Sequence, residues 1–125
     1  MHVVIVAGDS AGGNLTAALC LRRKAKGGPQ PIGQLLIYAG LGGDPTKGSY
    51  IENANAPMLT AKEGAYYFKI RTGGRSREEV SDPDIMPLKA GDLTGLPPAF
   101  VVSADIDPIR DDSRVYVERL TAAGV

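Results

Sequence analysis

The sequence has few residues that would suggest a metal or redox protein. Its 125 residues contain one cysteine, one histidine and no tryptophan. Cys20 therefore has no partner within the chain for a disulfide, and the four cysteines of a zinc site are not available. Because Cys20 falls inside a segment with a helical pattern, we expect it to be a small buried residue. No metal and no cofactor are predicted.

An excess of charge of one sign is also lacking. The chain has 14 basic and 14 acidic residues, which favours neither nucleic-acid binding nor attraction to an anionic membrane. No apolar run approaches the roughly 20 residues of a membrane span. The first residues lack the charged region and cleavage site of a signal peptide, so the expected compartment is the cytoplasm. Hydrophobic residues make up 43% of the chain, and we expect a folded domain rather than disorder.

Strand and helix patterns alternate along the chain. Strands are expected at 3–7, 34–39 and 99–104, and the first has the β-branched composition of a strand covered on both faces of a parallel sheet. Helices are expected at 11–26, 60–71 and 112–123, with a helical turn at 76–80 and loops at 40–57 and 82–98. The pattern predicts an α/β fold of about three parallel strands with crossover helices, in three layers over part of the chain.

Two local patterns refine these helices. In the first helix Leu15, Ala18 and Leu19 lie on one face, which we expect to be the buried one. Before the second helix, Thr60 followed three residues later by Glu63 predicts a capping box.

A glycine-rich turn, Gly8-Asp9-Ser10-Ala11-Gly12, joins the first strand to the first helix. A P-loop would need a lysine after its second glycine, and none follows. A dinucleotide-binding turn would need glycine where Ser10 stands, because a side chain there intrudes on the pyrophosphate. No acidic residue ends the second strand, where a partner for the ribose would lie. The turn therefore does not favour nucleotide binding.

The same five residues match Gly-x-Ser-x-Gly, placed between a strand and a helix as a nucleophile elbow requires. Such a turn is so sharp that bulky residues two positions away would collide, which gives Gly8 and Gly12 a steric role. Ser10 would stand at the helix N-terminus, with the N–H of Ala11 directed at a developing oxyanion. We predict Ser10 as a catalytic nucleophile. The alternative is a tight turn with an incidental serine.

The elbow sequence GDSAGGNL resembles that of the hormone-sensitive-lipase-like esterases, a branch of the α/β-hydrolase fold. Three further stretches agree with that family in the expected order: QLLIYA, SYIENANAPMLT and LTGLPPAFVVSADIDPIRDDSRVYVERLTAAGV. The resemblance covers essentially the whole chain. It implies a lipase-like serine carboxylesterase that hydrolyses short- to medium-chain acyl esters through an acyl-enzyme without a cofactor. The partner would be a small-molecule ester.

The resemblance also implies that Asp107, in the stretch DPIRDD, is the acid of the catalytic triad. A carboxylate just beyond the C-terminal end of a strand lies on the sheet edge where Ser10 emerges. It would orient a histidine and stabilise the imidazolium. Asp105 is a rival from the same loop, and Asp111 is a candidate to cap the last helix; the cluster as a whole could also be capping and solvated charge. Asp9 fits the family but is assigned no proton transfer.

Two parts of the family's machinery are absent from the sequence. No His-Gly-Gly-Gly loop precedes Ser10, and no histidine follows Asp107. His2 opens the first strand, roughly 20 Å from Ser10 at about 3.3 Å per residue, whereas a general base needs contact at about 3 Å. We therefore expect residues 1–125 to be a single α/β-hydrolase core segment, truncated at both ends and inactive in isolation.

Within this segment, residues 58–80 are expected to form pocket or cap helices. Tyr66, Tyr67 and Phe68 would line the pocket or pack on the helix face. Bare apolar edges of the sheet would promote self-association. Two other functions stay open, a non-catalytic small-molecule-binding module of the same fold and a fragment without a function of its own.

Overall fold

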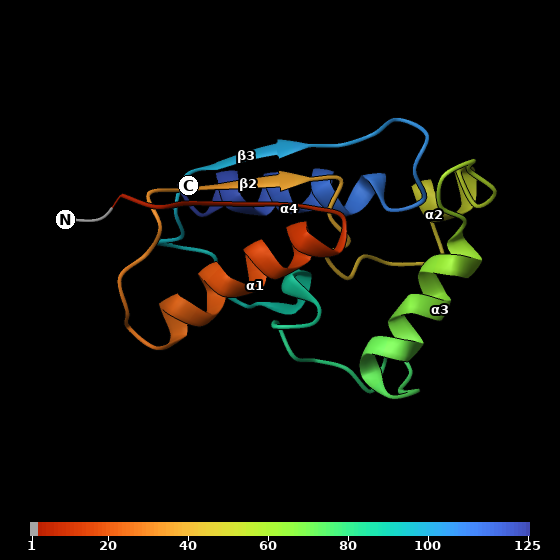
Figure 1. Cartoon of the computed structure of the whole chain (residues 1–125), viewed down its shortest axis with the longest axis horizontal. Coiled ribbons are helices and arrows are strands. Elements are labelled where there is room, and N and C mark those ends of the chain that lie inside the picture. Colours follow the sequence, from red (N-terminus) through yellow and green to blue (C-terminus); the bar gives the residue numbers. More distant parts are fainter. Residues whose placement is uncertain (1–2) are drawn as a thin grey trace.

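The computed structural model describes residues 3–125 (Figure 1). A parallel three-stranded sheet stands at one end, and helices lie beside it and beyond it. In chain order the elements are β1 (Ile5–Asp9), α1 (Ala11–Ala25), β2 (Gly33–Ile37), α2 (Ser49–Glu52), α3 (Ala61–Thr72), the short 3₁₀ helix η1 (Pro87–Lys89), β3 (Ala99–Val102) and α4 (Arg110–Ala122).

The sheet has the order β1-β2-β3, and both strand pairs are parallel. In register, Gly8 pairs with Leu36, and Leu36 pairs with Val101. Helix α1 connects β1 to β2, whereas the connection from β2 to β3 contains α2, α3 and η1. The predicted α/β class with three parallel strands and crossover helices is confirmed. In Figure 1 the arrows of β2 and β3 point toward α3, which lies beyond the carboxyl ends of the strands.

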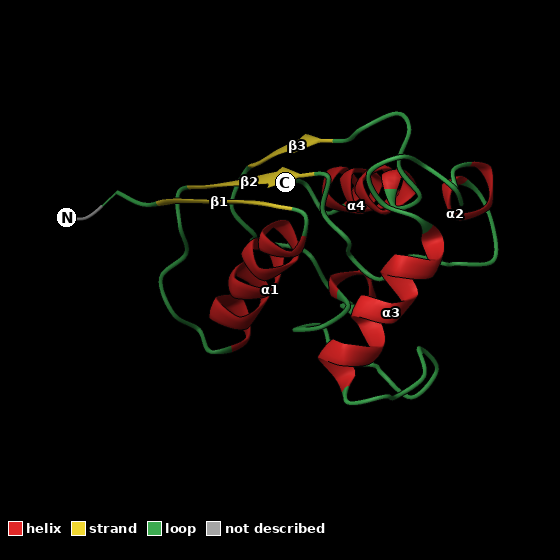
Figure 2. Cartoon of the chain, turned by 45° about the vertical axis from the view of Figure 1, so that its right-hand side comes forward, coloured by secondary structure: helices red, strands yellow, loops and turns green. Residues whose placement is uncertain are grey.

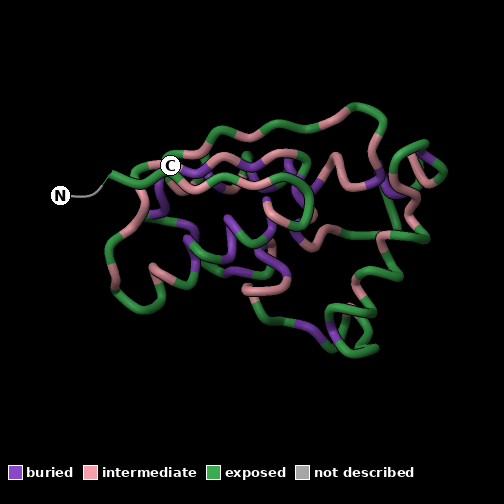
Figure 3. Tube along the Cα trace, in the orientation of Figure 1, coloured by how far each residue is buried: buried purple, intermediate pink, exposed green. Residues whose placement is uncertain are grey.

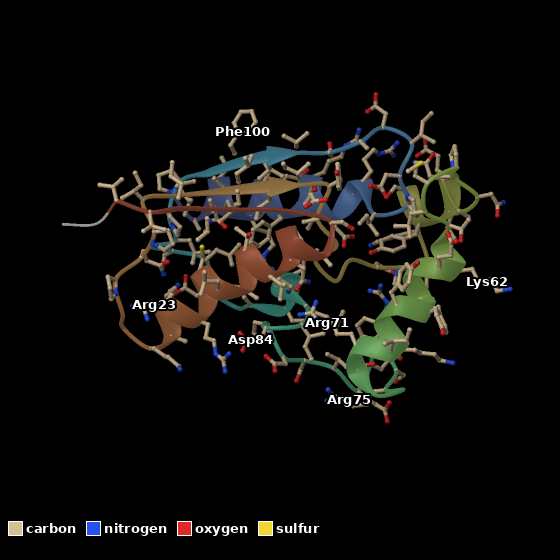
Figure 4. The ribbon with its side chains drawn as sticks, viewed as in Figure 1. Arg23, Lys62, Arg71, Arg75, Asp84 and Phe100 are labelled. Atoms are coloured by element: carbon tan, nitrogen blue, oxygen red, sulfur yellow. The ribbon has the colours of Figure 1, made fainter. Side chains whose placement is uncertain are left out.

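The prediction of three layers is wrong for residues 3–125, because α1 and α4 cover the same face of the sheet. Leu36 at the sheet centre belongs to one buried cluster with Cys20 of α1 and Tyr116 of α4. Side chains of the opposite face are open to solvent: Ile5 is 63% and Phe100 70% exposed. Figure 3 shows β3 as exposed and intermediate, and Phe100 points away from the helices in Figure 4. The expectation that the first strand is buried on both faces is therefore also wrong.

The buried face of α1 overlaps the predicted one only at Ala18, which is buried. Leu15 is 60% and Leu19 42% exposed, whereas Ala17 and Cys20 are fully buried. The small residues face the sheet because they allow the helix to approach it closely. The prediction of a buried Cys20 is confirmed, and burial raises the pKa of its thiol to about 11.

The predicted capping box of α3 is confirmed. The N–H of Glu63 donates to Oγ1 of Thr60 at 3.1 Å, and the N–H of Thr60 donates to Oε2 of Glu63 at 2.8 Å. Residues 76–80 form a turn rather than helix, closed by the bond from Glu79 N–H to the Ser76 carbonyl at 3.2 Å.

Several other boundaries differ from the predictions. Strand β1 lies two residues later than expected, and β2 and β3 each end two residues earlier. The segments expected as loops contain α2 and η1, and α4 begins two residues earlier than expected. Figure 2 shows how much of the chain between β2 and β3 is loop.

The outer strands of the described sheet are β1 and β3. Their outer edges carry unpaired backbone groups, and self-association through them stays a prediction. No helix among residues 3–125 is long and apolar enough to span a bilayer.

Candidate functional site

Ser10 occupies the turn between β1 and α1 in a conformation that residues with side chains rarely adopt. Its φ is 51° and its ψ is −114°. Such a backbone costs about 1–3 kcal/mol and persists only where neighbouring contacts hold it. Here the N–H of Ser10 donates to the carbonyl of Ile37 at 2.8 Å, and the carbonyl of Ser10 accepts from Asn14 N–H at 3.2 Å. Ser10 is thus exposed on an anchored, strained turn.

The turn at Ser10 requires glycine at two positions, Gly8 and Gly13. A Cβ on Gly8 would lie 2.2 Å from the carbonyl oxygen of Gly12, and a Cβ on Gly13 would lie 2.6 Å from Cβ of Ala39. The same steric role expected for Gly12 is not found: a Cβ there would meet only Oδ1 of Asp9, at 3.9 Å. Gly8 is therefore required because the backbone of Gly12 fills the space of its side chain.

Substituting Gly8→Ala is expected to lower the free energy of unfolding by about 3 kcal/mol, because the overlap is with backbone that no rotamer change can relieve. Gly12→Ala is the matched control, two residues away with free space for a methyl group, and should change stability by less than about 1 kcal/mol. Chemical denaturation followed by circular dichroism measures both. Equal stability of the two variants would contradict this account of the turn.

Ala11 is the first residue of α1 and therefore has a backbone N–H without an intrahelical acceptor. Ser10 and Ala11 both line a cavity of about 460 Å³. The N-terminal end of α1 thus meets this cavity with a serine and a helix-terminal N–H side by side.

Helix α3 forms much of the opposite wall of this cavity. Tyr67 and Phe68 line it, whereas Tyr66 does not and is 61% exposed. The two alternatives given for these aromatic residues therefore do not hold uniformly, since two of the three border the cavity and one does not. The position of α3 beyond the strand ends, visible in Figure 1, brings these aromatic side chains to the end of the sheet where Ser10 lies.

Asn14 links the elbow helix to the walls of the cavity. It is 4% exposed, and its Nδ2 donates to the carbonyl of Gly40 at 2.7 Å and to that of Ile85 at 2.9 Å. Its Oδ1 accepts from Nη1 of Arg71 at 2.7 Å. Sequence reasoning missed this residue; the available signal was an asparagine one helical turn after Ser10.

Asp107 lies in the loop between β3 and α4. Its Oδ1 accepts from the N–H of Ile109 at 2.9 Å, and its carbonyl accepts from Nδ2 of Asn53 at 3.2 Å. Burial raises the pKa of the Asp107 carboxyl above its usual range, against the lowering effect of the bond from Ile109. Asp107 is not among the residues that line the cavity, but the next two, Pro108 and Ile109, are. The loop of Asp107 and the turn of Ser10 therefore border the same cavity.

The neighbouring aspartates have other environments. Asp105 is exposed. The prediction that Asp111 caps the last helix is wrong, because that helix has no side-chain cap and begins after Ile109. Asp111 instead accepts from the N–H of Ser49, at the start of α2, at 2.9 Å. That hydrogen bond holds the pKa of Asp111 below its usual range, opposite to the shift at Asp107.

Asp112 is a buried anchor that sequence reasoning missed. It is 1% exposed, and its Oδ2 accepts from the N–H of Leu41 at 2.7 Å and of Gly42 at 3.2 Å, while Oδ1 accepts from the hydroxyl of Tyr50 at 2.9 Å. Burial raises the pKa of Asp112, and the bonds from Leu41 and Tyr50 oppose the shift. Asp112 thereby ties the start of α4 to the loop after β2. The sequence held one indication of this burial. Asp112 precedes Tyr116 by four residues and therefore lies on the same face of the helix.

Among residues 3–125 no group of three histidine, cysteine or acidic side chains is placed to hold a metal ion. The one histidine, His2, lies outside the described residues, so its expected distance from Ser10 stays a prediction.

Comparisons with known proteins agree on one group of enzymes. A family described as having the alpha/beta hydrolase fold matches residues 1–125. The carboxylesterase NlhH of Mycobacterium tuberculosis is 42% identical over 126 residues, which cover 98% of this chain and 39% of that protein. The esterase LipI of the same species is 40% identical over 122 residues, covering 98% and 38%.

Solved structures give the same result. The crystal structure of the apo form of ESTFA is 38% identical with a TM-score of 0.87, and it covers 100% of this chain and 40% of that one. The chain thus spans about two fifths of the length of these relatives.

Proposed function

Because the chain belongs to the α/β-hydrolase fold family, in its hormone-sensitive-lipase-like branch of esterases, we propose that it is the nucleophile-bearing segment of a serine carboxylesterase. The observation that carries this proposal is Ser10. It has a φ of 51° between a strand and a helix, and its side chain borders a cavity of about 460 Å³.

In the proposed reaction Ser10 Oγ attacks the ester carbonyl while the N–H of Ala11 donates to the oxyanion. The alcohol leaves, and water then releases the acid from the acyl-enzyme. Asp107 is the proposed acid of the triad and would stabilise an imidazolium. Residues 3–125 contain no histidine. We therefore propose that the general base comes from a segment outside these residues, and that the isolated chain does not turn over ester.

Residues 58–80 are the proposed pocket wall. The cavity beside Ser10 is lined by aromatic and small residues of α3, and its volume lies in the range of small-molecule sites. Both features fit short- to medium-chain acyl esters as the substrate class.

The proposal is tested in a chimaera in which this chain replaces the matching segment of NlhH, so that the relative supplies the missing histidine. We expect the chimaera to hydrolyse para-nitrophenyl butyrate and to be labelled by a fluorophosphonate on the peptide that contains Ser10. The isolated chain should do neither. A folded chimaera that neither hydrolyses the ester nor takes the label would refute the esterase assignment.

A non-catalytic binding module is the second candidate. Two observations together favour it: a cavity lies beside Ser10, and residues 3–125 contain no histidine to activate that serine. Ligand binding by the chimaera without fluorophosphonate labelling would support it over catalysis.

A further inference from the structure

The cavity beside Ser10 contains two positively charged side chains in an otherwise mostly apolar lining. They are Arg71 of α3 and Arg77 of the loop that follows it. Within residues 3–125 neither guanidinium forms an ion pair, although six other ion pairs are present there. An unpaired guanidinium in a partly enclosed site is suited to an anionic ligand, which it binds with two parallel hydrogen bonds.

Arg71 reaches the immediate surroundings of the nucleophile. Its Nη1 donates to Oδ1 of Asn14 at 2.7 Å, and its Nη2 donates to the carbonyl of Asp84 at 3.0 Å. Asn14 lies one helical turn after Ser10, a rise of about 6 Å. Figure 4 shows Arg71 between α1 and α3. Both acceptors are neutral, so they fix the guanidinium without cancelling its charge; the Asp84 carboxylate is paired with Arg22 at 3.4 Å.

Arg77 lines the same cavity and lies over two of its aromatic rings. Its guanidinium carbon lies 4.9 Å from the ring centroid of Phe68 and 5.7 Å from that of Tyr50. Its Nη1 donates to the carbonyl of Gly43 at 2.8 Å, again a neutral acceptor. Phe68 and Arg71 are three residues apart on α3 and therefore neighbours on its surface. Arg71, Phe68 and Arg77 thus all belong to the lining of the same cavity.

One carboxylate, Asp112, is part of the cavity wall. It is almost fully buried and accepts hydrogen bonds from two backbone N–H groups and the hydroxyl of Tyr50. The lining therefore holds two guanidinium groups against one carboxylate, which leaves an excess of one positive charge.

We propose that this cavity selects esters whose acyl chain carries a second, free carboxylate, such as half-esters of short dicarboxylic acids, and that Arg71 and Arg77 bind that carboxylate. The inference rests on the proposed function for the position of the scissile ester, next to Ser10. The carboxylate would lie about one helical turn from it, near Arg71.

Binding to the full chain tests the inference without any turnover. Calorimetry should show that glutarate binds and that pentanoate, with the same number of carbons, binds at least tenfold more weakly. Arg71→Gln and Arg77→Gln should each weaken glutarate binding about tenfold or more. Arg75→Gln is the control, because Arg75 follows the same helix but does not line the cavity. Equal affinity for the two ligands, or an equal loss in all three variants, would overturn the inference.

A second measurement covers the case in which Arg71→Gln disturbs packing through its bond to Asn14. In the chimaera with NlhH we expect the ratio of kcat/KM for para-nitrophenyl hemiglutarate to that for para-nitrophenyl pentanoate to fall about tenfold in Arg77→Gln. Because the ratio compares two substrates of one variant, a general loss of folding cancels. Turnover without preference for the hemiglutarate would refute the inference and leave the esterase proposal intact. Glutarate binding that depends on Arg71 and Arg77, without turnover of either ester, would refute the esterase proposal alone.

Discussion

Substituting Ser10→Ala should abolish ester hydrolysis by the chimaera with NlhH, with a loss on the order of a millionfold in kcat. The reason is that Ser10 would form the acyl-enzyme, and the methyl group of alanine cannot form that ester bond. Hydrolysis of para-nitrophenyl butyrate measures the loss, with the uncatalysed rate subtracted.

The variant must be shown to fold, because Ser10 has a positive φ. Alanine pays the same backbone strain as serine, so the free energy of unfolding should change by less than about 1 kcal/mol. Ser103→Ala is the matched control, since Ser103 is an exposed serine just after β3, and it should keep full activity. Retained turnover in Ser10→Ala would exclude Ser10 as the nucleophile.

Substituting Asp107→Asn should lower kcat of the chimaera by about ten-thousandfold. An amide keeps the size of the carboxylate but cannot stabilise an imidazolium or select the right histidine tautomer. Asp105→Asn is the control from the same loop; Asp105 is exposed and should tolerate the change with less than tenfold loss. A larger loss in Asp105→Asn than in Asp107→Asn would transfer the acid role to Asp105.

The stability of Asp107→Asn separates catalysis from folding. Burial raises the pKa of Asp107 in the folded chain, so the folded state binds its proton more tightly than the unfolded state does. Stability then falls as the pH rises through the interval between the unfolded and the folded pKa, and the penalty persists at neutral pH. The Asn side chain removes that penalty and keeps an oxygen for the N–H of Ile109. Denaturation at neutral pH should therefore show unchanged or higher stability.

The features that the sequence predicted correctly depend on residues close together in the chain. The capping box needs only Thr60 and Glu63, and the sharp turn at Ser10 was indicated by the glycine at position 8, two residues before it. The α/β class follows from alternating strand and helix patterns, each read over a few residues. Gly12 is the exception, because its expected clash depended on the actual direction of the chain after Ser10.

The features that the sequence did not predict depend on residues far apart in the chain. Helix α1 buries the face that carries its small residues, because these allow the helix to approach the sheet closely. The helical spacing of Leu15 and Leu19 did not indicate that face. Asp112 bonds to Leu41, 71 positions away, and Arg71 to Asn14, 57 positions away. No pattern within one segment identifies such partners, because each side chain's environment is created by the packing of another element against it.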